Sequence, residues 1–461
     1  MKTSDFHSVG LKKDLINNLE SLGYINMTPI QELSLPLILS NKDLIGQGET
    51  GTGKTAAFGL GLLQKLDVKI FKAQSIVLCP TRELADQVAT EIRRLARVIN
   101  NIKVLTLCGG SPFGPQIGSL KHGVHVIVGT PGRIEDHLRK GSLKLDNITT
   151  LVLDEADRML DMGFQETIDK IIEKIPVKRQ TLLFSATFPE EIESISQRIM
   201  DNPVKVKAQQ TLKEDNIKQF FYKVVTDDDR MKAIRLLLSK HKFGSVLVFC
   251  NTKVDTQDVA DELIYYGYYA IAIHGDLDQR ERDQSLIRFA NKSVSVLVAT
   301  DVAARGIDID SLDMVINFNL AHDSEVHVHR IGRTGRAGKT GIACSLYSDK
   351  EIHKLDSLGL GIDGTKFSDP LPSDSYLDKP IQKPKMTTLK IDGGKKQKLR
   401  PGDIVGALTG KGGITGDNIG KIYVSSNWSY VAVSSVLVKT ALNKIKMDKL
   451  KGRSFRVRIL S

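Results

Sequence analysis

The feature that most constrains the fold is an alternation between short apolar, β-branched runs and longer amphipathic stretches, from about residue 40 to residue 346. Runs of this length and composition suit strands that are buried on both faces of a parallel sheet. Strands that alternate with helical stretches predict doubly wound α/β layers. The runs are residues 75–79, 125–129, 150–154, 181–185, 245–250, 295–300 and 313–318.

The two halves of this region resemble each other. "VLCPTRELADQVA" (77–89) is similar to "VFCNTKVDTQDVA" (248–260), an offset of about 170 residues. We therefore expect two tandem copies of one α/β domain, at residues 1–207 and 208–367.

A third block follows a proline-rich linker, residues 368–384. Residues 385–461 hold 16 Lys+Arg and 4 Asp+Glu, a net charge of +12 in a chain whose total is +11. Apolar and amphipathic stretches follow in the order β-α-β-β-α-β, which predicts a small α+β domain. A charge this uneven favours a polyanionic partner, although a solvated basic surface is the simpler alternative.

The rest of the chain narrows the class of protein. No apolar run reaches the length of a signal peptide or the roughly 18 residues of a membrane span. The four cysteines are scattered and form no CxxC pair, which is typical of reduced thiols in a cytoplasmic protein. We expect no membrane association and no obligate protein partner.

The glycine-rich segment "GETGTGKT" (48–55) fits the pattern G-x-x-x-x-G-K-[ST]. Gly51 and Gly53 let backbone N–H groups approach phosphate oxygens. Lys54 would reach the β- and γ-phosphates of ATP, and the Thr55 hydroxyl would bind Mg²⁺. The alternative is a plain glycine-rich turn.

Three carboxylates, Asp154, Glu155 and Asp157, follow a buried strand about 100 residues after this segment. Asp154 at the end of a parallel strand would hold Mg²⁺, and Glu155 would orient and deprotonate the attacking water. Helix capping would explain one of these acids, but not all three.

With these motifs in place, the chain resembles the DEAD-box RNA helicases over about residues 1–365. Other family signatures occur in order. They are "GYINMTPIQ" (23–31), "PTREL" (80–84), "GG" (109–110), "TPGR" (130–133), "SAT" (185–187), "VFCNT" (248–252), "HGDLDQRER" (274–282), "ATDVAARGID" (299–308) and "HRIGRTGR" (329–336). The resemblance implies that both α/β domains are RecA-like.

The resemblance also assigns roles. Gln31 would bond the adenine edge, Phe6 would stack on the base, Asp308 would contact the ribose, and Arg333 and Arg336 would be arginine fingers. A further set would couple the ATP and RNA sites: His329, Asp157, Ser185 and Thr187. Backbone-binding RNA contacts are implied at Thr81, Arg82, Gly109, Gly110, Thr130, Arg133, Arg282 and Thr300.

The basic block resembles the RNA-binding domain of DbpA-type DEAD-box proteins, an RRM-like fold. That type acts on large-subunit (23S) ribosomal RNA and in 50S ribosome assembly, so pre-50S particles are implied partners. Stacking aromatics of the usual RRM kind are not evident. RNA contact would then rely on basic residues: Lys395, Lys396, Lys398, Arg400, Lys411 and Arg453.

One departure from the family and two alternatives stay open. The family usually has Ala-x-Thr-Gly in its P-loop, where this chain has Gly48 and Glu49. An ATP-gated RNA clamp or chaperone without strand separation would share every motif. A DNA helicase of the same superfamily is a further alternative, against which the Gln31 motif and the RRM-like block argue.

Overall fold

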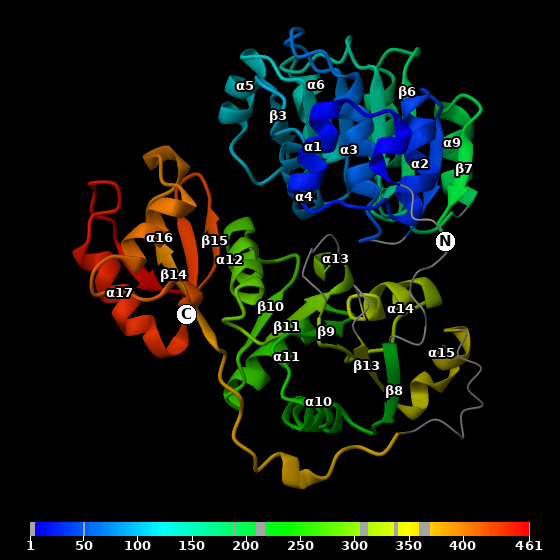
Figure 1. The fold of residues 1–461 in the computed structure, drawn as a ribbon. Coiled ribbons are helices and arrows are strands. Elements are labelled where there is room, and N and C mark those ends of the chain that lie inside the picture. Colours follow the sequence, from blue (N-terminus) through cyan, green and yellow to red (C-terminus); the bar gives the residue numbers. More distant parts are fainter. Residues whose placement is uncertain are drawn as a thin grey trace. The chain divides into compact units, whose positions relative to one another are not determined.

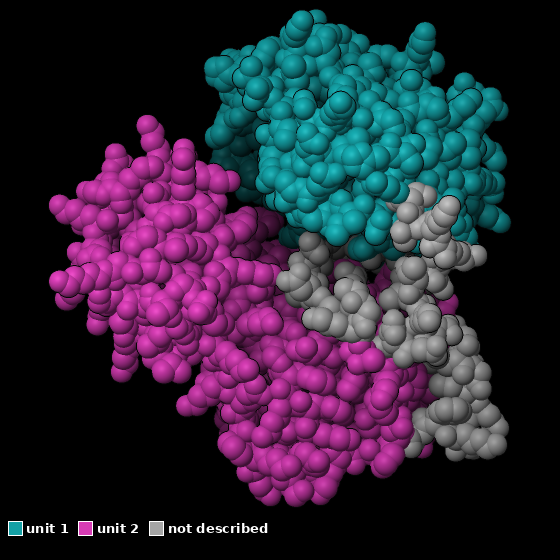
Figure 2. Space-filling view, in the orientation of Figure 1, with its two compact units in different colours: residues 1–211 teal, residues 212–461 magenta. Residues whose placement is uncertain are grey.

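The computed structural model describes residues 5–48, 51–188, 190–208, 217–304, 312–335, 340–358 and 369–460. The chain divides into two compact units, residues 1–211 and 212–461 (Figure 2). Each unit is described here by itself. Predicted site residues Asp308 and Arg336 lie outside the described residues, as does Glu49.

Unit 1 is a doubly wound α/β domain (Figure 1). Within the described ranges its sheet has seven parallel strands in the order β3-β4-β2-β5-β6-β1-β7. Its strands are β1 (Leu44–Gln47), β2 (Ser75–Leu78), β3 (Val104–Leu107), β4 (Val126–Gly129), β5 (Thr150–Asp154), β6 (Gln180–Ser185) and β7 (Val204–Lys207). Its helices are α1 (Lys13–Ser21), α2 (Pro29–Leu39), α3 (Lys54–Lys65), α4 (Arg82–Leu95), α5 (Phe113–Lys121), α6 (Pro131–Arg139), α7 (Ala156–Asp161), α8 (Gln165–Ile172) and α9 (Glu190–Ile199).

Two separate apolar clusters cover the two faces of this sheet. Side chains from α1 to α4 pack with one set of strand residues, including Phe58 and Phe184. Side chains from α6 to α9 pack with the alternate set, including Met159 and Ile171. Because both faces are covered, the inner strands β2, β4 and β5 are buried at every position rather than at every second one.

Unit 2 begins with a second α/β domain. Among its described residues, six parallel strands lie in the order β10-β11-β9-β12-β13-β8. The strands are β8 (Ile217–Lys223), β9 (Val246–Cys250), β10 (Ala270–Ile273), β11 (Val296–Thr300), β12 (Met314–Asn317) and β13 (Gly341–Tyr347). The helices are α10 (Asp227–His241), α11 (Lys253–Tyr265), α12 (Gln279–Ala290), α13 (Asp301–Ala304), α14 (Ser324–Ile331) and α15 (Ile352–Ser357).

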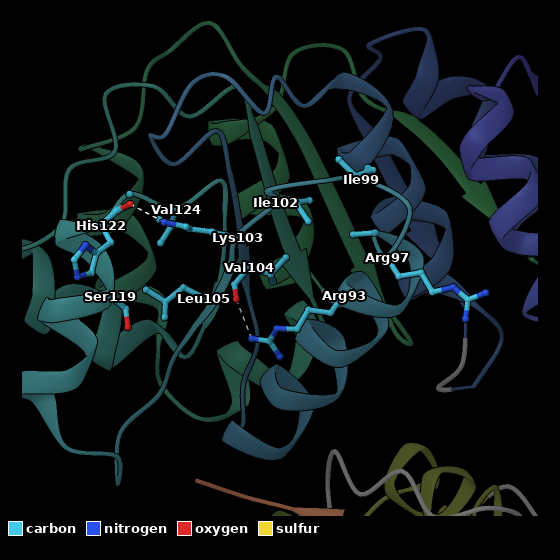
Figure 3. Close-up of a pocket in the computed structure, with 12 residues that line it drawn as sticks. Arg93, Arg97, Ile99, Ile102, Lys103, Val104, Leu105, Ser119, His122 and Val124 are labelled. Atoms are coloured by element: carbon cyan, nitrogen blue, oxygen red, sulfur yellow. Dashed lines mark hydrogen bonds between the residues drawn. The ribbon is translucent and has the colours of Figure 1, made fainter. Parts of the chain in front are cut away.

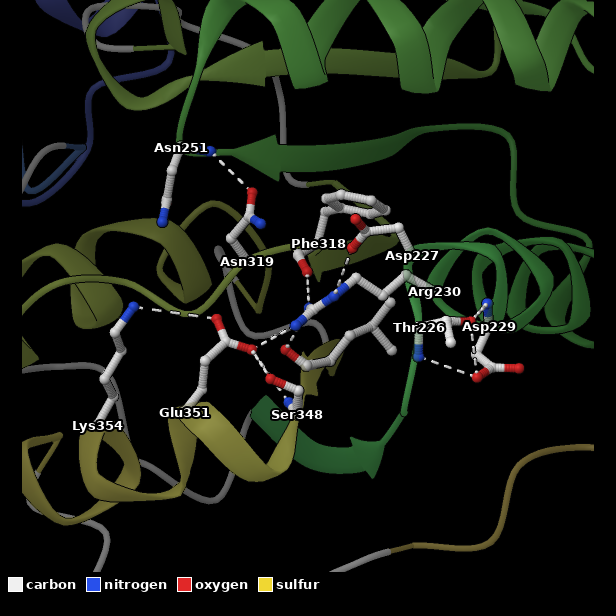
Figure 4. A network of polar contacts seen from close by, with 11 residues as sticks. Thr226, Asp227, Asp229, Arg230, Asn251, Phe318, Asn319, Ser348, Glu351 and Lys354 are labelled. Carbon is white, nitrogen blue, oxygen red and sulfur yellow. Dashed lines mark hydrogen bonds and ion pairs between the residues drawn. The ribbon is translucent and has the colours of Figure 1, made fainter.

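A buried arginine joins several segments of this second domain (Figure 4). Arg230 of α10 is 5% exposed and donates to the backbone oxygens of Phe318 and Leu346. It also pairs with Glu351, which in turn accepts hydrogen bonds from the amide and hydroxyl of Ser348, both at 3.0 Å. The guanidinium thus holds the ends of β12 and β13 against the first turn of α10.

The C-terminal part of unit 2 has the predicted β-α-β-β-α-β order. Its elements are β14 (Met386–Ile391), α16 (Pro401–Thr409), β15 (Ile419–Val424), β16 (Ser429–Ser434), α17 (Val438–Met447) and β17 (Val457–Ile459). The strands pair antiparallel in the order β15-β16-β14-β17. Both helices pack on one face of this sheet and share a separate apolar core with it.

The described part of the linker, from residue 369, runs along the second α/β domain and makes contacts there. The Asp369 amide donates to the Phe221 carbonyl at 2.8 Å, and Lys232 pairs with Asp374 at 2.7 Å. Leu371 packs against the apolar core of that domain. Residues 369–374 of the linker are therefore anchored on this domain.

Two other expectations concern the whole chain. All four cysteines are buried and unpaired, and burial raises the pKa of the Cys108 thiol to about 12. The sequence-based view of them as reduced thiols is consistent with this placement. Across the described ranges, no helix combines the length and the apolar character that a membrane span requires.

Candidate active site and RNA-binding face

The carboxyl ends of the strands of unit 1 gather the predicted residues at one edge of the sheet. Neighbouring strands β5, β6 and β1 end at Asp154, Ser185 and Gln47. The glycine-rich loop follows β1 directly and leads into α3. In open α/β sheets this edge is where ligands bind, and here it brings the loop and the carboxylates together.

The described part of the loop uses backbone conformations that favour glycine. Gly53 has φ +95°, and a Cβ at this position would lie 2.4 Å from the side-chain nitrogen of Gln31. Gly51 also has a positive φ, +87°. The Lys54 ammonium is buried and donates to the Gly48 carbonyl at 2.7 Å, so it lies within the loop that it is expected to serve. Thr55 follows in the first turn of α3.

Gln31 is fixed against this loop. Its side-chain amide donates to the Gly53 carbonyl at 3.1 Å and accepts from the Thr28 amide at 2.9 Å. Phe6 is 2% exposed and meets Tyr24 edge-on at 6.5 Å between ring centroids. The structure thus brings Gln31 to the loop and places Phe6 in the apolar cluster of helices α1 to α4.

Asp154 is a buried carboxylate with an unused oxygen. It is 2% exposed, and its Oδ1 has no hydrogen-bond partner within the described part of the chain. Burial raises the pKa of Asp154 to about 7, although the Lys54 charge acts in the opposite direction. An orphaned, buried carboxylate oxygen near a phosphate-binding loop suits a cation such as Mg²⁺, which takes one or two protein carboxylates and otherwise substrate oxygens and water.

Glu155 and Asp157 have different surroundings from Asp154. Glu155 has φ +53° and pairs with Arg158 at 3.1 Å, both side chains being almost fully buried. Asp157 accepts from the amides of Ala186 and Thr187 at 3.2 and 3.0 Å, and from the Thr187 hydroxyl at 3.0 Å. Burial opposes ionisation, but the Thr187 bonds and the Arg158 charge hold the pKa of Asp157 below its usual value.

The predicted RNA contacts of unit 1 gather on the other half of the same edge, at the ends of β2, β4 and β3. Thr81 caps α4, accepting from the Leu84 amide at 3.3 Å. The Arg82 guanidinium lies on the glycine pair, because a Cβ at Gly110 would be 1.9 Å from it. Gly110 also has φ +73°, so only glycine fits this approach without strain.

A second arginine lies beside this pair. Arg133 follows Thr130, the N-cap of α6, and donates to the Ser111 carbonyl at 2.9 Å and to Gln116 at 3.0 Å. Sheet order therefore separates the predicted ATP residues, at the ends of β5-β6-β1, from the predicted RNA contacts, at the ends of β3-β4-β2. These two groups of strand ends are called the ATP half and the RNA half below.

Unit 2 reveals a residue that motif reasoning missed. Arg330 is 1% exposed and donates to both oxygens of Asp301 at 2.7 Å, to Asn251 at 2.8 Å and to the Asn319 carbonyl at 2.7 Å. It lies in α14 three residues before Arg333, which is itself 7% exposed. The three-residue spacing of arginines in "HRIGRTGR" marks Arg330 as a member of the same cluster as Arg333. The spacing does not indicate that the Arg330 guanidinium pairs with both oxygens of Asp301.

The remaining predicted residues of the second α/β domain lie on separate elements. Thr300 ends β11 and accepts from the Ala303 amide at 3.3 Å. Arg282 lies on α12, and His329 lies on α14. In the C-terminal part of unit 2 the six predicted basic residues are all exposed: Lys395, Lys396, Lys398, Arg400, Lys411 and Arg453.

A cavity of about 600 Å³ lies elsewhere in unit 1, between α4, α5 and the edge strand β3 (Figure 3). Its basic lining residues, Arg93, Arg97 and Lys103, already bond to neighbouring groups: the Val104 carbonyl, the Ser21 hydroxyl and the His122 carbonyl. Lys103 precedes β3, so this cavity is at the amino ends of the strands, away from the candidate site.

Comparison with known proteins places this geometry in a family. The family models "DEAD/DEAH box helicase", "Helicase conserved C-terminal domain" and "DbpA RNA binding domain" match residues 28–195, 229–338 and 388–459. The chain is 52% identical over 445 residues to ATP-dependent RNA helicase DbpA of Escherichia coli (strain K12), covering 96% of this chain and 97% of the relative. The chain belongs to the DEAD-box family of ATP-dependent RNA helicases.

Other members of the family agree with this assignment. The helicase is 46% identical over 352 residues to DEAD-box ATP-dependent RNA helicase CshA of Geobacillus kaustophilus (strain HTA426), covering 76% of this chain and 75% of the relative. A solved structure of S. cerevisiae Dbp5 bound to RNA and ADP BeF3 matches with TM-score 0.72 at 31% identity, over 81% of this chain and 97% of that one. The predicted fold class is confirmed, and so is the prediction of an ATP-dependent RNA helicase.

Proposed function

We propose that this helicase uses ATP to open short duplexes locally in large-subunit (23S) ribosomal RNA during 50S assembly. The observation that carries the proposal is the C-terminal domain, which matches the DbpA RNA-binding family and exposes a set of basic side chains. A relative over nearly the whole chain is named DbpA. The setting would be the cytoplasm, with pre-50S particles as partners.

The chemistry would be hydrolysis of ATP at the ATP half of the sheet edge. The loop amides and Lys54 would hold the phosphates, with Gln31 and Phe6 at the adenine and Asp308 at the ribose. Mg²⁺ held by Asp154 and Thr55 would neutralise charge on the β- and γ-phosphates. Asp154 supports this role through its unpartnered buried oxygen.

Glu155 would take the proton of the attacking water. Arg333 and Arg336 would neutralise charge that develops on the γ-phosphate once ATP and RNA bring the two α/β domains together. Asp157, with Ser185, Thr187 and His329, would couple this closure to RNA.

On the RNA half of the edge, amides and hydroxyls would read phosphates and 2′-hydroxyls, which tolerates many sequences. The residues are Thr81, Arg82, Gly109, Gly110, Thr130 and Arg133, continued by Arg282 and Thr300. Specificity for ribosomal RNA would come from the C-terminal domain, through Lys395, Lys396, Lys398, Arg400, Lys411 and Arg453.

The alternative function is an ATP-gated clamp that holds ribosomal RNA without separating strands. A strand-separation assay on a short duplex distinguishes the two, since a clamp would bind and hydrolyse ATP yet release no strand.

The test of specificity compares the full chain with a chain that ends near Lys379. We expect both to keep RNA-stimulated ATPase activity, and the shortened chain to lose its preference for ribosomal RNA over an unrelated RNA of equal length. Its RNA binding should also depend less steeply on salt, because each lost phosphate contact removes about one unit of slope. Equal discrimination by the two chains would place specificity in the α/β domains and contradict the proposal.

A further inference from the structure

The sheet of the C-terminal domain is buried on a face where a domain of this kind usually meets solvent. An antiparallel sheet with helices on one side normally exposes the other. Leu389 and Val431 point to the helices α16 and α17. Their neighbours Thr388, Lys390 and Tyr430 point the other way, yet they are only 0%, 1% and 3% exposed. Something other than the domain's own helices covers the two central strands.

That cover comes from α12 and the turn after it, in the second α/β domain of the same unit. Asn291 donates to the Thr388 hydroxyl at 3.1 Å, and the Ser293 hydroxyl bonds the same oxygen at 2.7 Å. The Arg280 guanidinium stacks over the ring of Trp428 at 4.9 Å. The contacts span the central strands of the sheet and the β15–β16 turn.

The helical period shows which side of α12 contacts the sheet of the C-terminal domain. At 100° per residue, Arg280, Gln284 and Asn291 fall on one face. Gln284 lies within hydrogen-bonding reach of Tyr430 on β16. Arg282, the predicted RNA contact, is about 200° from Arg280, on the opposite face. One helix thus carries a docking face and a separate face for RNA.

We propose that the sheet face of the C-terminal domain is an intramolecular docking surface for α12 and is therefore closed to RNA bases. Docking fixes the direction in which the domain presents its exposed basic residues, and the anchored linker supports the same placement. Tyr430 has the position of a stacking aromatic on a central strand, but it serves the domain contact.

A single tryptophan, Trp428, reports on this contact in the full-length protein. Thr388→Arg and Ser293→Arg each insert a long cation into it from opposite sides. Position 388 would face solvent in an undocked C-terminal domain, and Ser293→Arg alters no residue of the C-terminal domain. Neither change therefore disturbs the apolar core of the C-terminal domain. Val436→Arg, at a position 91% exposed on the same domain, is the matched control.

We expect Thr388→Arg and Ser293→Arg each to increase acrylamide quenching of Trp428 and the radius of gyration measured by X-ray scattering. Because one insertion is enough to separate the surfaces, the double variant should match the single ones. Arg280→Ala, at an exposed position, should increase acrylamide quenching of Trp428 without changing the radius of gyration. If both insertions leave quenching and radius at the values of wild type and of the Val436→Arg control, the docking proposal is overturned.

The consequence for RNA rests on the proposed function and has its own measurement. Ser293→Arg should bind large-subunit ribosomal RNA transcribed in vitro with the same affinity as wild type. Tighter binding would also fit closure, because the variant uncovers a face that α12 masks in wild type. Weaker binding would mean that the docked arrangement contributes RNA contacts at this face, which overturns its closure to bases. If wild type shows no preference for ribosomal RNA, the proposed function fails, while the fluorescence result on docking stands.

Discussion

Replacing Asp154 with asparagine should stabilise unit 1 while removing ATP turnover. The reason is that Asp154 is buried with an unpartnered oxygen, and burial raises its pKa from 3.8 to about 7. Folding therefore has to bury a carboxylate that resists ionisation at neutral pH. Asparagine keeps the shape of the side chain without the charge.

The direction in which stability changes with pH follows from proton binding to Asp154. Between pH 4 and 7 the folded protein holds a proton on Asp154 that the unfolded chain has lost, so this group makes stability fall as pH rises through that window. Each unit of pKa corresponds to about 1.4 kcal/mol. The raised pKa of Asp154 therefore lowers the free energy of unfolding by about 4 kcal/mol at pH 8 and by about 2 kcal/mol at pH 5. Relaxation around the charge lowers both figures, so they are upper values.

Thermal unfolding of the unit-1 transition, without nucleotide and with EDTA, measures this effect. A domain of about 200 residues gains roughly 2–4 °C for each kcal/mol, so Asp154→Asn should raise Tm by several degrees at pH 8 and by less at pH 5. Asp157→Asn is the matched control with the opposite sign. Asp157 accepts several hydrogen bonds and its pKa is lowered, so its loss should destabilise. A lower Tm for Asp154→Asn, or a gain independent of pH, would refute the reasoning.

Four further predictions concern single residues. Glu155→Gln should bind ATP and RNA but turn over about 10²–10⁴-fold more slowly in single-turnover hydrolysis, and a loss of only a few-fold would exclude it as the base. Arg333→Ala should slow hydrolysis on the order of 10³-fold with little change in the Kd for ATP, whereas a change in Kd alone would make it a ground-state ligand. Arg330→Met should cost about 1–3 kcal/mol in urea unfolding of unit 2, since it removes the hydrogen-bonded partner of the Asp301 carboxylate, whose side chain is only 18% exposed; a value near zero would contradict the geometry. Gly110→Ala should raise the RNA concentration needed for half-maximal ATPase activity, while Gly132→Ala, whose added Cβ would meet nothing within 4 Å, should not.

The fold class, and the gathering of the candidate site residues at one edge of the sheet, could be predicted because local signals agree with the global fold. Continuous apolar runs such as 151–153 require cover on both faces, and turns rich in glycine mark the strand ends where ligands bind. Gly53 and Gly110 illustrate this agreement. Both have positive φ, and a side chain at either position would collide with a candidate site residue, Gln31 or Arg82.

Contacts between distant segments could not be predicted in the same way. Arg330 stands in a recognisable motif, but its bond to Asp301 depends on how α14 packs at the end of β11. Thr388 and Tyr430 alternate correctly for a strand with one solvated face, so nothing in their pattern indicates cover on that face. Alternation reports which residues share a face, whereas the identity of the covering element depends on tertiary packing.

Sheet order gives unit 1 a short physical route between its ATP and RNA halves. Strand β5, which ends at Asp154, lies directly between β2 and β6. Neighbouring strands are about 4.8 Å apart. A shift of the turn after β5 would therefore directly displace the segments that follow β2 and β6. Asp157 already bonds the backbone after β6 at Ala186 and Thr187. On the other side, β2 leads into Thr81 and the α4 N-terminus. Under the proposed function, a rearrangement at the carboxylates on ATP hydrolysis would therefore have to travel only one strand in each direction, and no long chain of contacts would be needed to couple the two halves.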